Sequence, residues 1–273
     1  MHNHVEGKVI AITGAGSGFG RLTAQKAAAL GARVLCIDID LASAQAVAEG
    51  IGAAAVAVRA DVSQIEDMRA AIAVAVERFG RVDVMVNNAG TMPLAFLADH
   101  EAALAAWNRC IDINFKGVMN GTVAVHDQMI AQGSGHVINL SSIYGNFPLS
   151  GAAVYGATKA AVDYFSHAVR QESQGKIKVT VIKPSGVSST GLAGSVVNAA
   201  SAMGIFGHNA PEALATYARI REEGLVPPGS DSIGYFSLEA DYIADAIIHA
   251  INQPLGVAIS DITVRAAGDL YIP

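Results

Sequence analysis

The chain has 273 residues, of which 52% are hydrophobic and 15% are charged. A chain of this length and composition can bury a large core, which excludes an intrinsically disordered protein. Its 18 basic residues are outnumbered by 24 acidic ones, which argues against nucleic acid as a partner, because binding to a phosphate backbone depends on clustered cations.

The apolar runs are interrupted well before the roughly 18 residues that indicate a membrane span. The N-terminus leads directly into an apolar strand pattern and lacks the basic-then-apolar pattern of a secretory signal. We therefore expect a cytoplasmic protein without a membrane partner. Cys36 lies in a strand pattern and Cys110 in a helical one, so both are expected to be reduced packing residues.

Short apolar runs alternate with helical patterns from the first residues to about residue 183. This alternation is typical of βαβ units on a parallel sheet, and near-continuous apolar strands indicate that helices cover both faces. A seventh strand is predicted at 257–264, after a helix at 239–252. The other predicted strands are 8–13, 32–38, 54–60, 82–87, 135–141 and 177–183, and the other predicted helices are 18–30, 41–49, 64–79, 101–131 and 152–174.

Residues 184–238 interrupt this regular pattern. They are rich in Gly, Pro, Ser and Asn and contain one predicted helix, at 211–223. Long irregular segments in compact domains are usually functional or disordered, and we interpret this one as a lid over a substrate site. No linker is evident, so we predict a single domain over residues 1–273.

A glycine-rich turn, Thr13-Gly14-Ala15-Gly16-Ser17-Gly18-Phe19-Gly20, joins the first predicted strand to the first helix. Glycines at this place let the backbone approach a pyrophosphate, and the helix N-terminus supplies free N–H groups. Asp38 ends the second strand, 18 residues after Gly20, where a carboxylate can accept hydrogen bonds from a ribose 2′-hydroxyl and repel a 2′-phosphate. This position favours NAD over NADP, although a strand-end turn residue is the alternative interpretation.

Further motifs follow in a fixed order: Asp61-Val62, Asn87-Asn88-Ala89-Gly90, Asn114, Ser142 and Tyr155-Gly156-Ala157-Thr158-Lys159. Together with the glycine-rich turn, over about residues 6–190, they resemble the short-chain dehydrogenase/reductases, and more narrowly their compact NAD(P)-dependent branch. The resemblance implies a Rossmann-type, doubly wound parallel α/β sheet of about seven strands.

The resemblance also implies which residues bind the cofactor. Turn residues would line the pyrophosphate and ribose, Asp61 and Val62 would hold the adenine, and Val187 would meet the nicotinamide carboxamide through its backbone. Where the family usually has Pro-Gly-x-Val-x-Thr, this chain has Ser185 for the Gly, and Ser189 or Thr190 could replace the Thr. The expected cofactor-binding residues are Gly14, Ser17, Gly18, Phe19, Gly20, Asp38, Asp61, Val62, Asn88, Ala89, Gly90, Tyr155, Lys159, Pro184, Gly186, Val187 and Ser189.

Tyr155 and Lys159 are four residues apart in a helical stretch, which places both on one helix face. A free tyrosine has a pKa of about 10, and a nearby ammonium together with the positive nicotinamide ring is expected to lower the pKa of Tyr155. Tyr155 would then be the general acid/base, and Ser142, near the carboxyl edge of the sheet, would hold the substrate oxygen. By the resemblance, Lys159 also binds the nicotinamide ribose and Asn114 supports a water chain from Lys159 to solvent.

His126, His136, His167, His208 and His249 are scattered without metal-ligand spacing, and no metal is predicted. Mostly apolar residues are placed to touch substrate, which favours a fairly bulky apolar or cyclic secondary alcohol or ketone. Some of these residues lie in the predicted lid, and packing of the lid against its own domain would explain them almost as well. They are Met203, Ile205, Phe206, Tyr217, Leu225 and Tyr235. The expected substrate contacts are Met92, Ser142, Ile143, Tyr144, Asn146 and Gly186.

Family members are commonly tetramers or dimers, so a homo-oligomer is expected.

Taken together, these patterns predict a cytoplasmic NAD-dependent oxidoreductase that interconverts a secondary alcohol and a ketone. Two alternatives remain open. One is a dinucleotide-binding sensor or scaffold without turnover, and the other is an isomerase or dehydratase that uses bound NAD transiently.

Overall fold

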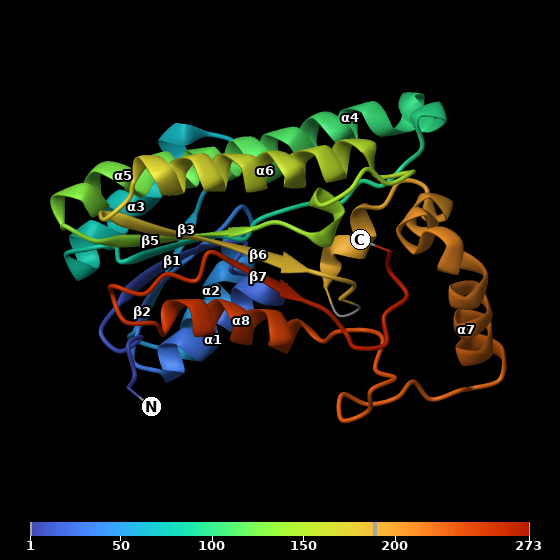
Figure 1. Ribbon diagram of the computed structural model, residues 1–273. Helices are drawn as coiled ribbons and strands as arrows, with labels where there is room; N and C mark the ends of the chain where they lie inside the picture. Colours follow the sequence, from blue (N-terminus) through green and yellow to red (C-terminus); the bar gives the residue numbers. More distant parts are fainter. Residues whose placement is uncertain (1, 188–189, 273) are drawn as a thin grey trace.

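Seven parallel strands form one sheet in the order β3-β2-β1-β4-β5-β6-β7 (Figure 1). The structure, a computed structural model, describes residues 2–187 and 190–272. All six strands predicted before residue 184 are present, and the predicted doubly wound α/β sheet is confirmed. The strands are β1 Val9–Thr13, β2 Arg33–Asp38, β3 Ala55–Arg59, β4 Val84–Asn87, β5 Gly135–Leu140, β6 Ile177–Pro184 and β7 Asp261–Val264.

Helices cover both faces of the sheet (Figure 1). One apolar cluster joins the sheet to α1 Gly18–Ala29, α2 Leu41–Ile51 and α8 Ala240–Ile251. The other face carries α3 Ile65–Phe79, α4 His100–Ile111, α5 Gly117–Ala131 and α6 Ala153–Glu172. Because both faces are covered, β1, β4 and β5 are buried along their whole length, as their continuous apolar sequences predict.

The chain reverses its direction of winding between β3 and β4, because β4 pairs with β1 on the side opposite to β2. In open α/β sheets, ligands bind outside the carboxyl ends of the strands at such a switch point. The glycine-rich turn follows β1, and the segments after β4, β5 and β6 carry Asn88, Ser142 and Gly186. The topology therefore brings the sequence motifs to one edge of the sheet.

The helix predicted at 101–131 is interrupted. A π-helical turn at Asp112–Lys116 separates α4 from α5 and contains Asn114. Single π turns inside α-helices are frequent at functional sites. The seventh strand is shorter than predicted, because only Asp261–Val264 pairs with β6.

The segment predicted to be a lid has more regular structure than its composition indicates. The predicted helix is present as α7 Ala210–Glu222, and two 3-10 segments, Gly191–Ser195 and Ala199–Asn209, precede it. Asn198 caps the second of these by accepting a hydrogen bond from the Ala200 N–H at 3.0 Å. Sequence periodicity missed both segments because a 3-10 turn lacks the 3.6-residue repeat.

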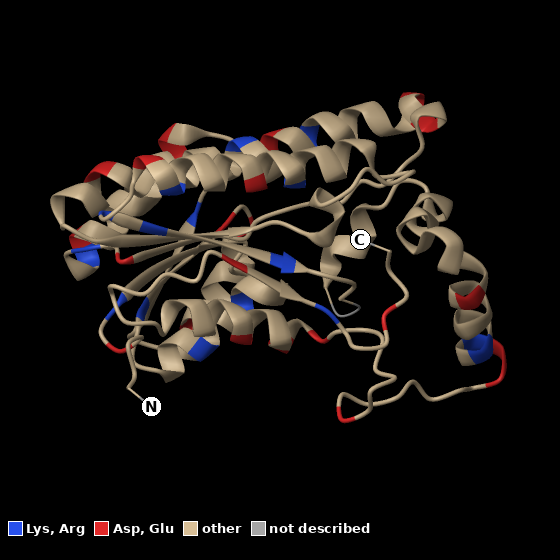
Figure 2. Cartoon of the chain, viewed as in Figure 1, with Lys and Arg blue, Asp and Glu red and all other residues tan. Residues whose placement is uncertain are grey.

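Lys and Arg are interspersed with Asp and Glu over the helices and strand ends (Figure 2). Over the part of the chain that the structure describes, no helix is both long enough and apolar enough to cross a membrane.

Candidate active site

A cleft of about 1100 Å³ lies at the carboxyl edge of the sheet. Its walls come from the glycine-rich turn, the segments after β4, β5 and β6, helix α6, the segment from Thr190 to Glu239, and Tyr271 near the C-terminus. Among its described lining residues, Lys159 and Glu239 alone carry a charged side chain. The cleft is therefore largely apolar, with a few polar groups near the strand ends.

The glycine-rich turn needs glycine for its close contacts. Gly14 has a φ of 65°, a backbone conformation that residues with a side chain rarely adopt. A Cβ on Gly20 would collide with the carbonyl oxygen of Gly14, and a Cβ on Gly16 would lie 2.6 Å from the Cβ of Ser43. The turn therefore packs directly on the start of α1, as a phosphate-binding turn must.

Thr13 and Asn88 join this turn to the segment after β4. The Thr13 Oγ1 accepts hydrogen bonds from the N–H groups of Asn88 and Ala89, at 3.0 and 3.1 Å. In return, the Asn88 amide donates to the carbonyl oxygens of Thr13 and Gly14, at 2.8 and 3.2 Å. The sequence analysis assigned no role to Thr13, although it is the first residue of the motif.

The N-terminus of α1 is suited to an anion. Ser17 is the N-cap residue, but its side chain makes no capping hydrogen bond, and the first turn of the helix carries no acidic residue. The first N–H groups of a helix have no partner within the helix, and its dipole favours negative charge there. Ser17, Gly18 and Phe19 all line the cleft, so this end of α1 fits a pyrophosphate.

Asp38 ends β2 beside the same turn. Its carboxylate accepts hydrogen bonds from the N–H groups of Gly16, at 2.9 Å, and Asp40, at 3.0 Å. Asp38 therefore also braces the glycine-rich turn, in addition to carrying the acceptor atoms expected for a ribose.

Four expected cofactor residues lie outside the cleft wall. Gly20 and Asp38 pack against or brace the turn, as described above. The Asp61 carboxylate accepts from the Ser63 N–H at 2.9 Å, and the Val62 carbonyl accepts from the Asn120 amide at 2.8 Å. Gly14, Ser17, Gly18, Phe19, Asn88, Ala89, Gly90, Tyr155, Lys159, Pro184, Gly186 and Val187 all line the cleft, whereas Ser189 is outside the described residues.

Ser142, Tyr155 and Lys159 converge on this cleft. Ser142 follows β5 and caps a short 3-10 turn, and its side chain hydrogen-bonds that of Tyr155. The Lys159 Nζ donates to the carbonyl oxygen of Leu140 at 2.8 Å and lies 5.7 Å from the centre of the Tyr155 ring. Both α6 side chains are almost fully buried, with 4% exposure for Tyr155 and 6% for Lys159.

The protonation of these two side chains follows from burial. Desolvation raises the pKa of Tyr155 above its usual value, and the Ser142 hydrogen bond opposes this only in part. Burial therefore opposes the lowering of the Tyr155 pKa that a nearby ammonium and a bound nicotinamide ring together are expected to produce. Burial also lowers the pKa of Lys159 to about 8, against the opposing effects of Cys110 and Asp163.

Asn114 lies behind the cleft wall, fully buried in the π turn. Its amide donates to the Thr91 carbonyl oxygen at 2.8 Å, and its Oδ1 accepts from the Thr91 N–H at 2.9 Å. The same amide lies 3.2 Å from the Sγ of Cys110 and 3.3 Å from the Oγ1 of Thr158. Asn114 therefore fixes the backbone of Thr91, which is part of the cleft wall.

Four of the expected substrate contacts, Met92, Ser142, Tyr144 and Gly186, line the cleft. Ile143 does not, because its side chain is buried in an apolar cluster with Ile205 and Phe206. Asn146 is also absent from the wall, and its Oδ1 accepts from the Lys183 Nζ at 3.3 Å. The structure therefore places Ile143 and Asn146 beside the substrate region rather than in it.

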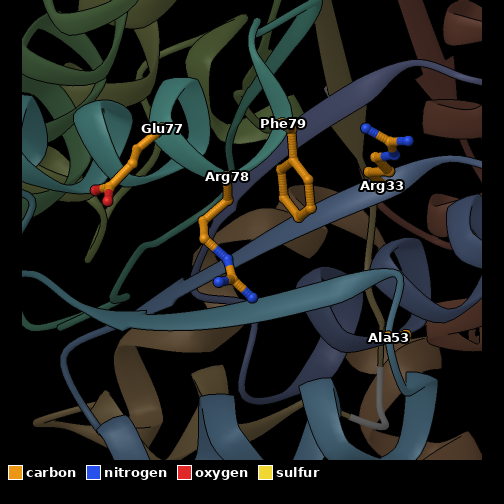
Figure 3. Close-up of a pocket in the computed structure, with 5 residues that line it drawn as sticks. All are labelled: Arg33, Ala53, Glu77, Arg78 and Phe79. Carbon is orange, nitrogen blue, oxygen red and sulfur yellow. The ribbon is translucent and has the colours of Figure 1, made fainter.

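A second hollow, of about 460 Å³, lies at the opposite edge of the sheet (Figure 3). Arg33 at the start of β2 contributes to it, and its guanidinium lies 5.8 Å from the centre of the Phe79 ring at the end of α3. The remaining lining residues are Ala53, Glu77 and Arg78. None of the sequence motifs reaches this hollow.

Both cysteines are free and buried, as predicted. Burial raises the pKa of the Cys36 thiol to about 12. Within the described ranges, no three His, Cys, Asp or Glu side chains form a group that could hold a metal ion.

Comparisons with known proteins agree with this architecture. A family model described as short chain dehydrogenase matches residues 8–207. An uncharacterized oxidoreductase of Staphylococcus saprophyticus is 32% identical over 267 residues, which cover 96% of this chain and 97% of that protein.

Solved structures share the fold along almost the whole chain. A 3-ketoacyl-(acyl-carrier-protein) reductase from Brucella melitensis, complexed with NADH, is 29% identical, with a TM-score of 0.77 and coverage of 97% of this chain and 99% of that one. The closed form of a serine dehydrogenase, complexed with NADP+, is 25% identical, with a TM-score of 0.76 and 94% coverage of both chains. These two similar proteins bind different dinucleotides.

Proposed function

The chain is an oxidoreductase that belongs to the short-chain dehydrogenase family, and we propose that it interconverts a secondary alcohol and a ketone with NAD as cofactor. The observation that carries this proposal is the convergence of Ser142, Tyr155 and Lys159 on the cleft that the glycine-rich turn also lines. The proposed reaction needs both a turn that binds the dinucleotide and a group that transfers a proton, and candidates for both line one cleft.

The side chains have separate roles in this proposal. When bound, the nicotinamide cofactor accepts or delivers the hydride. Ser142 holds the substrate oxygen through its hydroxyl, and Tyr155, to which Ser142 is hydrogen-bonded, transfers the proton at that oxygen. Lys159 supplies positive charge near the phenol and binds the nicotinamide ribose, and Asn114 holds the cleft wall and supports the proton path behind it.

The proposed preference for NAD rests on Asp38. Its carboxylate stands at the end of β2, next to the turn that would hold the pyrophosphate. A negative charge there repels a 2′-phosphate, whereas its oxygens accept hydrogen bonds from a 2′-hydroxyl.

The proposed substrate is a fairly bulky apolar or cyclic compound. The cleft wall away from the strand ends consists mainly of apolar and aromatic side chains from the segment at 190–239. No arginine is among the described residues of this wall, so a carboxylate or phosphate on the substrate would lack a bidentate partner. By covering this part of the cleft, the segment would act as a lid.

The test is to incubate the purified protein with NAD and a panel of cyclic, aromatic and terpenoid secondary alcohols. The expected result is the appearance of reduced cofactor together with the ketone. Cofactor binding without turnover on any member would favour a sensor or scaffold. Conversion of substrate with no net change in free cofactor would favour an isomerase or dehydratase.

A cytoplasmic location remains a prediction from the sequence. We also propose a homo-oligomer, a tetramer or dimer, that uses the outer face of α4 and α6. Leu104 and Ile111 of α4 and Tyr164 of α6 are exposed there. Light scattering in solution is expected to give a multiple of the 28.0 kDa chain mass, and a monomer would contradict the proposal.

A further inference from the structure

The C-terminal tail, residues 265–272, folds back onto the lid instead of leaving the molecule. Arg265 stabilises the bend of the tail by pairing with Asp269 and by donating to the carbonyl oxygen of Tyr271 at 2.8 Å. Backbone and amide hydrogen bonds then fix the tail to the lid: Gly268 N–H to Tyr235 O at 2.7 Å, Asn209 Nδ2 to Leu270 O at 3.0 Å and Ile272 N–H to Ile205 O at 3.0 Å.

The tail places the side chain of Tyr271 in the cleft wall. Its ring centre lies 5.0 Å from that of Phe206, and its hydroxyl hydrogen-bonds the side chain of Tyr217. Phe206 and Tyr217 are themselves 6.2 Å apart in an edge-on arrangement. The three rings form one packed aromatic wall, so Tyr271 cannot turn away without losing contacts to both partners.

Gly186 marks the other side of Tyr271. A Cβ at this position would collide with the Tyr271 hydroxyl oxygen and lie 2.5 Å from the adjoining ring carbon. Gly186 also lies in the strand-end segment proposed to meet the nicotinamide. The tyrosine therefore spans the gap between the proposed cofactor side of the cleft and the lid.

The aromatic wall begins close to the proposed catalytic phenol. The Tyr144 ring centre is 5.3 Å from that of Tyr155, and Tyr144 is also close enough to Tyr271 to disfavour its ionisation. A substituent that extends past Tyr144 from a carbonyl held by Ser142 and Tyr155 would therefore meet the ring of Tyr271.

On the basis of the proposed function, we infer that Tyr271 is a specificity-determining residue that limits the size of the larger substituent on the substrate and favours a flat, aromatic one. Gly186 is required because it leaves room for the Tyr271 hydroxyl. The C-terminal tail thus completes the substrate end of the site within a single chain.

The experiment compares kcat/KM over a series of aryl ketones in which the ring carries progressively larger para substituents. Tyr271→Ala is expected to raise kcat/KM for the largest members, relative to the smallest, by at least tenfold. Tyr271→Phe keeps the ring and is expected to retain the size limit within about threefold. Leu255→Ala is the control, because Leu255 follows α8, does not line the cleft and is 64% exposed.

A double substitution tests the contact itself. Gly186→Ala alone is expected to displace Tyr271 and lower kcat/KM by at least tenfold, while Tyr271→Ala combined with Gly186→Ala restores the space and recovers most of that loss. If Gly186→Ala lowers kcat/KM equally in the unmodified enzyme and in Tyr271→Ala, the contact between residue 186 and the Tyr271 hydroxyl does not affect activity.

The outcomes separate this inference from the proposed function. An unmodified enzyme that turns over the series, with the same size profile in Tyr271→Ala, would overturn the role of Tyr271 and leave the proposed function intact. An unmodified enzyme that binds the cofactor but turns over no alcohol or ketone would overturn the proposed function, and the specificity role with it. A changed size profile in Leu255→Ala would also count against a specific role for Tyr271.

Discussion

Tyr155 and Lys159 differ from surface residues of their type because both are withdrawn from water on the inner face of α6. In the unliganded protein, burial raises the pKa of Tyr155 further above neutral pH and lowers the pKa of Lys159 to about 8. In the proposed reaction, this neutral phenol is the form that donates a proton during ketone reduction. Alcohol oxidation needs the opposite protonation state and depends more on the bound cofactor.

Tyr155→Phe is expected to lower kcat by about 10²- to 10⁴-fold, because it removes only the hydroxyl that transfers the proton. The affinity for NAD, measured by fluorescence titration, is expected to stay within about threefold, because the substitution keeps the ring. A tenfold loss of affinity would correspond to about 1.4 kcal/mol of binding free energy. Tyr242→Phe in α8, on the other face of the sheet, is the control. Activity of Tyr155→Phe within a few-fold of the unmodified enzyme would remove Tyr155 from its role.

The pH dependence provides a second test of Tyr155. Alcohol oxidation requires the phenolate, so its kcat/KM at saturating cofactor is expected to rise with pH, by up to about tenfold per unit below the pKa of the complex. Ketone reduction requires the neutral phenol and is expected to fall or stay level over the same range. Profiles that run in the same direction for both reactions would contradict this assignment.

Asp38→Asn is the sharper variant for cofactor choice, because an amide oxygen can still accept from the Gly16 N–H while the charge is lost. The ratio of kcat/KM with NAD to that with NADP is expected to fall by about tenfold or more, which corresponds to about 1.4 kcal/mol. Asp40→Asn is the matched control, since Asp40 caps α2 by accepting from the Ala42 N–H. A native preference for NADP would refute the assignment before any variant is made.

Among the elements, the π turn between α4 and α5 holds part of the cleft wall in place. It directs Asn114 toward the backbone of Thr91, whose N–H and carbonyl oxygen are both bound by that one side chain. Thr91 lies beyond the end of β4, so its backbone has no neighbouring strand to bond with. The two hydrogen bonds from Asn114 satisfy these backbone groups instead.

Asn114→Ala is expected to lower the free energy of unfolding by about 2 kcal/mol, because two partly buried backbone groups lose their partner. It is also expected to reduce kcat/KM, since Thr91 and the neighbouring Gly90 line the cleft. Urea unfolding and steady-state kinetics measure the two effects. Gln45→Ala on the exposed side of α2 is the control, and equal effects of both substitutions would contradict a special role for Asn114.

The sequence predicted the elements that follow strong local rules. The six strands before residue 184 are continuous apolar runs, and the glycine-rich turn, Asn88, Ser142 and the Tyr155–Lys159 pair all occur at strand ends or on one helix face. The π turn was not predicted, because the apolar pattern of 101–131 continues through it. The role of Tyr271 was also missed, since no motif precedes it and its position depends on tertiary contacts between the tail and the lid.

At the scale of the whole molecule, a buried histidine ties the stability of the sheet to pH. His136 on β5 is buried, and its Nε2 lies 2.8 Å from the Oγ1 of Thr180 on β6. Desolvation, assisted by Lys178 and Lys8, lowers the pKa of His136 to about 3. The unfolded chain, in which the histidine pKa is near 6.5, therefore binds a proton that the folded protein excludes.

The contribution of His136 is fully present above about pH 6.5 and is lost as the pH falls toward 3, with a slope of up to about 1.4 kcal/mol per unit. His136→Gln is expected to flatten the dependence of unfolding free energy on pH between about 6.5 and 4.5. Urea unfolding at several pH values measures this, with exposed His126→Gln as the control. Identical slopes for the unmodified protein and His136→Gln would contradict the prediction.

The two ends of the described chain lie in different surroundings (Figure 1). Near the N-terminus, the Asn3 amide donates to the Leu30 carbonyl oxygen at 2.9 Å, at the edge of the sheet remote from the cleft. The other end is held against the lid through Ile272. A purification tag or fusion partner joined at the C-terminus would therefore begin beside the segment proposed to be a lid, whereas the same tag at the N-terminus would lie at the remote edge of the sheet.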